Sequence, residues 1–233
     1  GLEWKNPVGT ASGTFQYAAV RWFYDVSQLG AVCTKGASPV PWEGNPSPRT
    51  AESPAANINA VGLQNPGIDH YLAEDLPKLK AAGAFVISNV AGHCDDDYAA
   101  VVEKLADPDA DMLEINVSCP NVSAGGMSVG TDPVTLANLM DRLRPMTDKP
   151  MIVKLTPNVT DITVPARAAV EHGADALSMI NTLKGMRINI RTGKPIIANV
   201  TGGGSGPAGL PVRLGAVYRG RPVPPEVPTI GLG

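Results

Sequence analysis

The chain has 233 residues, of which 43% are hydrophobic and 18% charged, a composition typical of a globular protein rather than a disordered one. This length is sufficient for one large domain with a buried core, and we expect residues 1–233 to form a single domain. The formal net charge of -3 excludes a strongly basic face, so nucleic acid is not an expected partner.

Short apolar, β-branched runs alternate with helical patterns at intervals of roughly 25 to 40 residues, which is the rhythm of a parallel α/β fold. The runs are almost continuously apolar, as in strands that are buried on both faces. The predicted strands are residues 8–12, 31–35, 85–89, 112–117, 151–155, 176–181 and 227–232.

The stretch between the second and third predicted strands, residues 37–68, is rich in proline, glycine and asparagine. Its apolar residues show no helical or strand period. Because a loop of this length in a compact domain is usually functional, we predict a long active-site loop here.

Three later stretches have the signature of amphipathic helices. DDDYAAVVEKLAD has an acidic first turn, and its predicted apolar face is formed by Tyr98, Val101, Val102 and Leu105. TDPVTLANLMDRLRPM begins with Asp132 as N-cap and Pro133 in the first turn, and its predicted apolar face is formed by Leu136, Leu139, Met140 and Leu143. ITVPARAAVEHGAD predicts a third helix that ends at Gly173.

Polar residues close six of the predicted strands at their C-terminal ends: Ser12, Lys35, Asn89, Asn116, Lys154 and Asn181. In a parallel α/β fold this is the face where ligands bind, although a strand end can also be polar simply because it meets water. Two lysines among amides suit a planar ligand that carries or gains negative charge. A reduced flavin is one such ligand.

The sequence EINVSCPNV places Cys119 at the end of a strand, because Pro120 lacks a backbone donor and favours an extended conformation in the residue before it. Two interpretations are open. The motif is either an ordinary strand exit or a reactive thiol between the amides of Asn116 and Asn121.

The three cysteines are odd in number and unclustered, which argues against a disulfide framework and a zinc site. We therefore expect no metal and a reducing, cytoplasmic location. Cys33 lies inside a predicted strand and is expected in the core, and Cys94 precedes an acidic helix start that disfavours a thiolate. No apolar run reaches the roughly 18 residues of a membrane-spanning helix, so no membrane partner is expected.

The stretch GGGSGPAG contains Gly204, Gly206 and Gly209 at the GxGxxG spacing of a dinucleotide-binding fold. Pro207 inside the motif, and Gly215, Gly220 and Pro222 after it, weaken the helix that should receive the pyrophosphate. We therefore favour a glycine loop whose amides approach a phosphate or a ring. A plain flexible loop remains the other alternative.

A series of blocks resembles the class 1 dihydroorotate dehydrogenases, and within them the class 1B form. They are NPVGTASGTF, TKG, NPSPRTAESPAANINAVGLQNPG, SNVAGH, EINVSCPNV, GGMSVGTDP, IVKLTPNVTDI, INTLKGM and ANVTGGGSGPA, in the order of the family. The resemblance implies an FMN-containing (β/α)8 TIM barrel that oxidises dihydroorotate to orotate in pyrimidine (UMP) synthesis. It also implies a fragment truncated at both ends, with the eighth strand missing and residues beyond Gly233 absent.

The resemblance assigns roles to individual residues. Cys119 would be the catalytic base. The substrate would contact Lys35, Asn59, Ala60, Val61, Gly62, Leu63, Asn116, Asn121, Asn181 and Thr182. FMN would contact Ser12, Lys35, Gly36, Asn89, Asn116, Lys154, Ile180, Gly206 and Gly233.

The resemblance also implies partners. A second subunit with FAD and an iron-sulfur cluster would pass electrons to NAD, and the catalytic chains would form a homodimer.

The main alternative function is that of the pyrimidine-reducing domain of dihydropyrimidine dehydrogenases, which shares the Cys-Pro block. A cysteine hydrolase would need a histidine partner for Cys119, a non-catalytic domain would need no flavin, and a non-functional barrel fragment is a further possibility.

Overall fold

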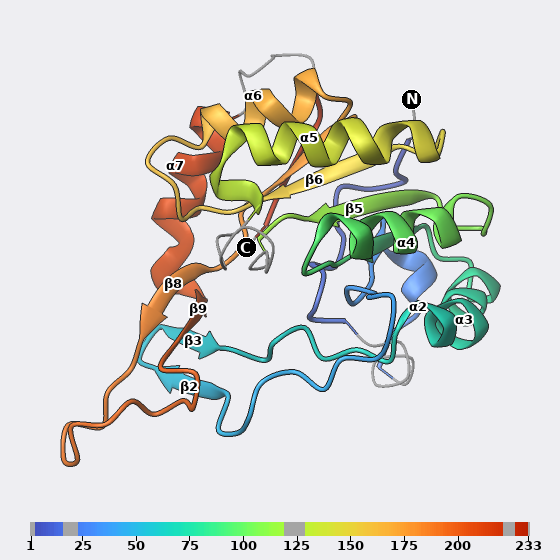
Figure 1. Ribbon diagram of the computed structural model, residues 1–233. Helices are drawn as coiled ribbons and strands as arrows, with labels where there is room; N and C mark the ends of the chain where they lie inside the picture. The colour runs from blue at the N-terminus through green and yellow to red at the C-terminus, as the bar shows by residue number, and fades with distance from the viewer. Residues whose placement is uncertain (1–2, 16–22, 119–128, 221–226, 233) are drawn as a thin grey trace.

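The computed structural model describes residues 3–15, 23–118, 129–220 and 227–232. Its main element is a parallel sheet (Figure 1) with the strand order β1-β4-β5-β6-β7-β10. These strands are β1 (Val32–Cys33), β4 (Val86–Val90), β5 (Met112–Asn116), β6 (Met151–Leu155), β7 (Ala176–Met179) and β10 (Thr229–Gly231). The predicted strand at residues 8–12 joins through a single parallel bridge between Gly9 and Ala31. All seven predicted strands therefore pair in the parallel sheet, most of them with shorter bounds.

Helices follow the strands and lie on one side of the sheet. The longer ones are α3 (Leu76–Ala81), α4 (Asp95–Leu105), α5 (Pro133–Leu143), α6 (Thr163–Glu171) and α7 (Leu210–Gly220), and α3 is preceded by α2 (Ile68–His70) and a π-helical turn (Tyr71–Asp75). Single 3₁₀ turns occur at Val26–Gln28, Val129–Thr131, Arg144–Met146 and Pro207–Gly209. Because each strand lies beside its predecessor in the chain, right-handed crossovers place the helices on the same face. No helix in the described ranges is long and apolar enough to cross a bilayer.

The sheet is strongly curved. Ser12 lies in the segment paired with β1, four strand positions from Lys154 on β6, so in a flat sheet about 19 Å would separate their strands. Instead the Lys154 Nζ donates a hydrogen bond of 2.8 Å to Ser12 Oγ. The described strands thus form a curved part of an α/β barrel, which confirms the predicted TIM-barrel class.

Two apolar layers account for the burial of the strands. The inner layer gathers side chains from β1 and β4 to β7, including Cys33, Ile87, Met112, Ile152 and Ala176. The outer layer packs the opposite faces of the strands against the helices. As predicted, the apolar faces of α4 and α5 are fully buried, and Asp132 caps α5 by accepting a hydrogen bond of 2.8 Å from Thr135 N.

The prediction that residues 37–68 are only a loop was wrong in part. They contain β2 (Thr50–Ser53) and β3 (Ala56–Asn59), which join β9 (Thr201–Ser205) and β8 (Leu183–Met186) in an antiparallel sheet with the order β2-β3-β9-β8. This sheet lies away from the helical layer (Figure 1). The sequence does not reveal this sheet, because β9 is mostly glycine, which has low strand propensity, and its partner β3 is distant in the chain.

The glycine run and the segment after it also differ from the prediction. Gly202, Gly203 and Gly204 are in strand β9 rather than in a loop, and α7 continues to Gly220 despite Gly215. Three residues of α7, including Ala216, are buried against the rest of the fold. Tertiary packing of this face therefore outweighs the low helix propensity of the two glycines.

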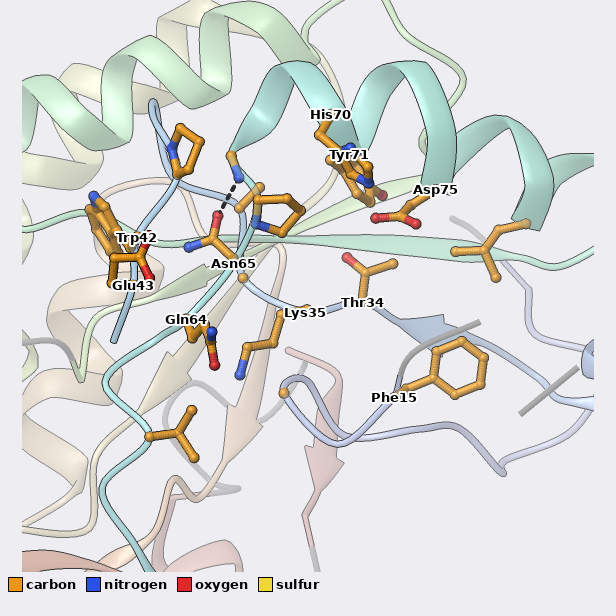
Figure 2. A pocket seen from close by; sticks show the side chains of 18 residues that line it. Phe15, Thr34, Lys35, Trp42, Glu43, Gln64, Asn65, His70, Tyr71 and Asp75 are labelled. Carbon is orange, nitrogen blue, oxygen red and sulfur yellow. Dashed lines mark hydrogen bonds between the residues drawn. The ribbon is translucent and has the colours of Figure 1, made fainter. Parts of the chain in front are cut away.

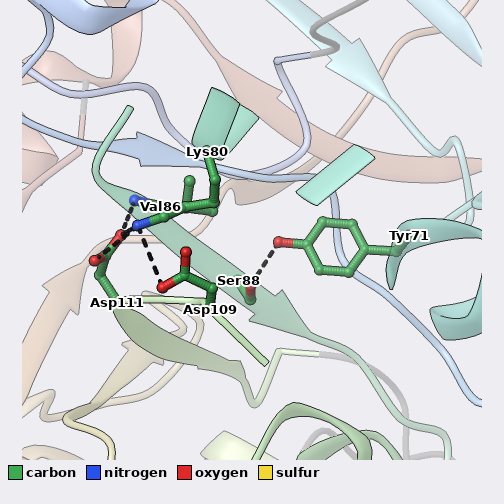
Figure 3. Close-up of polar contacts among 6 residues, drawn as sticks. All are labelled: Tyr71, Lys80, Val86, Ser88, Asp109 and Asp111. Carbon is green, nitrogen blue, oxygen red and sulfur yellow. Dashed lines mark hydrogen bonds and ion pairs between the residues drawn. The ribbon is translucent and has the colours of Figure 1, made fainter. Parts of the chain in front are cut away.

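Polar contacts fix the N-terminal ends of the strands (Figure 3). Lys80 Nζ donates to both carboxylate oxygens of Asp111, at 3.0 and 2.8 Å, and Asp111 also accepts from Val86 N at 2.7 Å. Farther along β4, the hydroxyls of Tyr71 and Ser88 lie 2.5 Å apart. Burial raises the pKa of Tyr71 to about 12, so this phenol stays protonated in its structural contact.

Candidate active site

The barrel interior changes from apolar to polar toward the C-terminal ends of the strands. Side chains alternate along a strand, so the residue two positions after each inner apolar residue also faces inward. These inward polar residues are Asn89 after Ile87, Glu114 after Met112, Lys154 after Ile152 and Ser178 after Ala176. The predicted ligand face is therefore lined by a buried polar layer.

Lys154 and Ser12, both predicted to contact the cofactor, are brought together in this layer by the 2.8 Å hydrogen bond. Lys154 is only 6% exposed. A buried cation with a neutral partner is a strong site for a ligand that carries negative charge.

The predicted substrate residues Asn116, Asn181 and Thr182 form one hydrogen-bonded chain. Asn181 Nδ2 donates to Asn116 Oδ1 at 3.2 Å, and Thr182 N donates to Asn181 Oδ1 at 2.7 Å. Tyr98, from α4, donates its hydroxyl to the Asn116 carbonyl at 2.7 Å. The ends of β5 and β7 are thereby linked at the ligand face.

The antiparallel sheet brings Asn59 close to this hydrogen-bonded chain. Asn59 pairs with Gly203 of β9 and donates through Nδ2 to the Gly203 carbonyl at 3.4 Å. A Cβ atom at Gly203 would lie 1.9 Å from Thr182 Oγ1, and one at Gly202 would lie 2.5 Å from the Asn59 carbonyl oxygen. These glycines are therefore required for the close approach of protein atoms, which the sequence interpretation had attributed to a phosphate or ring.

The segment from Ala60 to Leu63 is held by Asn45. The Asn45 backbone N–H donates to the Val61 carbonyl at 3.0 Å, and its side chain donates to the Ala60 carbonyl at 2.9 Å. Gly62 and Leu63 follow with positive φ values of 76° and 56°. This backbone suits glycine, and at Leu63 it is uncommon and indicates a segment fixed by its surroundings.

Asn65 anchors the other end of this segment and was missed by the sequence reasoning. It is 7% exposed, donates to the Leu63 carbonyl at 2.8 Å, and accepts from Ser38 Oγ at 2.9 Å and Gly67 N at 2.9 Å. Its position in QNPG, before a proline and a glycine, is a turn signal that could have identified it.

A cavity of about 740 Å³ brings Lys35, Gly36 and Val61 together beside the barrel (Figure 2). Figure 2 shows the side chains of Lys35 and Gln64 on the same side of this cavity. Burial, and then the nearby charge of Arg49, lower the pKa of Lys35. Lys35 is therefore a partly buried cation beside a repelling charge, a position that an anionic ligand would stabilise.

The remaining predicted cofactor residues lie in different surroundings. Gly36 is next to Asn89, because a Cβ atom at Gly36 would lie 2.7 Å from Asn89 Oδ1. Ile180 is buried directly after β7. Gly206, with a φ of 124°, accepts a hydrogen bond of 2.8 Å from Arg213 Nη1 and lies beside Ala55. Cys119, Asn121 and Gly233 are outside the described residues.

Glu114 and Ser178 are two further inward polar residues that the sequence reasoning missed. Glu114 is the one acidic residue in the apolar run of β5 and is 3% exposed. A charged residue inside a strand predicted to be buried on both faces was the available signal, because such a charge requires partners.

A sequence model described as dihydroorotate dehydrogenase matches residues 1–233. The chain belongs to the dihydroorotate dehydrogenase family. A dihydroorotate dehydrogenase B (NAD(+)) catalytic subunit of Alkaliphilus metalliredigens is 52% identical over 100% of this chain and 77% of its own length, and the protein of that name in Alkaliphilus oremlandii is 49% identical over the same shares. A relative from Aquifex aeolicus, 47% identical over 100% of this chain and 77% of its own length, is provisionally named dihydroorotate dehydrogenase A (fumarate).

Proposed function

We propose that this chain is the catalytic subunit of a dihydroorotate dehydrogenase, an oxidoreductase that converts dihydroorotate to orotate in pyrimidine synthesis. The observation that carries the proposal is the identity of 52% over the whole chain to a catalytic subunit of that name. The polar layer at the strand ends supports it, because amides and lysines meet where a pyrimidine and a flavin would need hydrogen bonds and positive charge.

The residues at this face fit FMN. Asn89 Oδ1 accepts no hydrogen bond from any described residue, Gly36 leaves the space beside it free of a side chain, and Lys154 supplies a buried positive charge. We propose that FMN contacts these residues with Ser12, Lys35, Asn116, Ile180, Gly206 and Gly233. When bound, FMN supplies the acceptor for the hydride that leaves C6 of dihydroorotate.

Cys119 is proposed to remove the C5 proton as the catalytic base. A thiolate is far more available near neutral pH than a serine alkoxide, since a free thiol has a pKa of about 8.5. Asn116 and Asn121 would hold the amide and carboxylate edges of the pyrimidine, and Lys35 would offset its negative charge. Fixing the ring between these groups contributes to the rate by orientation. Asn59, Ala60, Val61, Gly62, Leu63, Asn181 and Thr182 complete the proposed substrate contacts.

We also propose a partner subunit that carries FAD and an iron-sulfur cluster and delivers electrons to NAD. The names of the Alkaliphilus relatives, catalytic subunits of NAD(+)-dependent enzymes, favour this arrangement, and the Aquifex name makes fumarate the competing acceptor. We expect a homodimer of catalytic chains, and a cytoplasmic location from the odd, unclustered cysteines.

The dihydropyrimidine dehydrogenase alternative is not favoured, because the relatives reported above carry dihydroorotate dehydrogenase names. The two activities are separable by substrate. Turnover of dihydroorotate without reduction of uracil is the expected result, and preferential reduction of uracil would favour the alternative.

The cofactor is tested by denaturing the purified protein and identifying the released flavin by chromatography. We expect FMN in a ratio near one per chain, and recovery of the flavin absorption when the apoprotein is mixed with FMN. A protein that releases no flavin and does not bind added FMN would contradict the proposal.

A further inference from the structure

Glu114 is a buried charged residue to which the proposed reaction assigns no role. It lies in the middle of β5, faces the barrel interior between the inward side chains of Met112 and Asn116, and is 3% exposed. Water does not solvate a carboxylate at such a position, so hydrogen-bond donors from the protein must do so. The hydrogen-bond partners of Glu114 therefore indicate what this carboxylate does.

Three donors from three different strands converge on the Glu114 carboxylate. Asn89 Nδ2, from β4, donates to Oε1 at 2.7 Å, and Ser178 Oγ, from β7, donates to Oε2 at 2.8 Å. Cys33 Sγ, from β1, lies 3.4 Å from Oε1. All three contacts are donated to Glu114, as expected for a carboxylate, which has acceptor oxygens and no hydrogen to donate.

The contact with Glu114 determines which way the Asn89 amide points. Because the carboxylate can only accept, the NH₂ group of Asn89 must face it and Oδ1 must face the opposite side. That side is next to Gly36, where an added Cβ atom would lie 2.7 Å from Oδ1. In the described part of the chain no donor reaches Asn89 Oδ1, although Asn89 is only 1% exposed. An acceptor atom is thus left for a ligand.

We propose that Glu114 is a positioning residue for the flavin: it fixes the Asn89 amide so that Oδ1 accepts a hydrogen bond from a ring N–H of FMN. This inference rests on the proposed function. Glu114 also contributes a negative charge to the layer that holds Lys154. Both charges act on the Cys33 thiol, whose pKa is raised first by burial and then by Glu114, while Lys154 opposes the rise.

The charge has a consequence for the redox chemistry. Reduced flavin carries more negative charge than oxidised flavin, so a nearby carboxylate disfavours reduction and a nearby ammonium favours it. Replacing Glu114 by an uncharged residue should therefore raise the midpoint potential of bound FMN. A carboxylate too far from the flavin to act on it would leave this potential unchanged.

The test uses Glu114→Gln, the reversed pair Glu114→Gln with Asn89→Asp, and the control Glu103→Gln on the exposed surface of α4. In the single variant the glutamine amide keeps only one acceptor oxygen and gains an NH₂ group, so the Asn89 amide is no longer held in a single orientation. We expect FMN to bind about ten-fold more weakly or worse, with a more positive potential. The reversed pair restores both an acceptor at position 89 and the charge, so affinity and potential should return toward the wild-type values.

The measurements are FMN titration of the apoprotein by fluorescence quenching and a redox titration of the bound flavin. If the wild type does not bind FMN, the proposed function fails. If the wild type and Glu114→Gln bind FMN equally well, only the role of Glu114 fails. If the single variant does not fold, a folded reversed pair that binds FMN supports the role, and a reversed pair that does not bind FMN or does not fold overturns it.

Discussion

Lys35 loses its positive charge more readily than an exposed lysine, because burial and the neighbouring Arg49 both lower its pKa. A lysine with a lowered pKa loses its proton at a lower pH than an exposed lysine. Its attraction for an anionic substrate is therefore present below that pKa and lost as the pH rises through it.

We predict that orotate binding weakens with rising pH before ordinary lysines titrate, and that Arg49→Gln moves the midpoint of this loss to higher pH by removing a repulsive charge. Orotate titrations from about pH 7 to pH 10 measure the midpoint. Arg167→Gln, on the exposed face of α6, is the control and should leave it unchanged. An unchanged midpoint in Arg49→Gln would show that Arg49 does not act on Lys35.

For individual residues, the sequence was informative where a polar residue ends an apolar run. Asn89, Asn116 and Lys154 could be predicted because each closes an apolar strand at the ligand face. Glu114 has the same inward direction as Asn116 but lies inside the run, so a rule based on strand ends passes over it. The orientation of the Asn89 amide could not be predicted, because it depends on contacts among four strands.

At the scale of elements, α4 and α5 were predictable because their caps and apolar faces are local in sequence. The antiparallel sheet was not, because β3 and β9 are far apart in the chain and glycine has little strand propensity. The structure supplies the missing reason: Gly203 is a glycine because Thr182 occupies the space of its side chain.

We therefore predict that Gly203→Ala destabilises the protein by roughly 1–3 kcal/mol, as overpacked sites do, and raises the KM for dihydroorotate because Thr182 must move. Gly215→Ala in α7 is the matched control. Nothing lies within 4 Å of its added Cβ, and alanine favours a helix over glycine by up to about 1 kcal/mol. Denaturant unfolding and steady-state kinetics measure both effects; equal stability and KM in the two variants would refute the packing explanation.

At the scale of the molecule, the order of strands and the position of the ligand face follow from the βα rhythm, which is why the barrel class was predictable. The curvature that brings Ser12 to Lys154 was not readable from any single strand. The curvature results from the pairing of many strands around one apolar interior. It brings residues that are distant in the sequence together in one site.

We predict that the isolated catalytic chain, loaded with FMN, reduces an artificial dye with dihydroorotate but reduces NAD only slowly. The proposed FAD and iron-sulfur cluster belong to the partner subunit, so the isolated chain lacks the expected path for electrons to NAD. Parallel assays with the dye, NAD and fumarate compare the acceptors. Rapid NAD reduction by the isolated chain would contradict the need for a partner, and rapid fumarate reduction would favour the Aquifex-type acceptor.

The central claim is that this barrel uses bound flavin to oxidise dihydroorotate with Cys119 as base. The most direct measurement is anaerobic single-turnover bleaching of the flavin absorption after mixing with dihydroorotate, across pH, in the wild type, Cys119→Ser and Cys119→Ala. We predict rapid bleaching in the wild type that accelerates with pH toward the thiol pKa, a loss of roughly two or more orders of magnitude in Cys119→Ser at neutral pH, and retained FMN in both variants. Flavin reduction in Cys119→Ala at close to the wild-type rate would contradict the account.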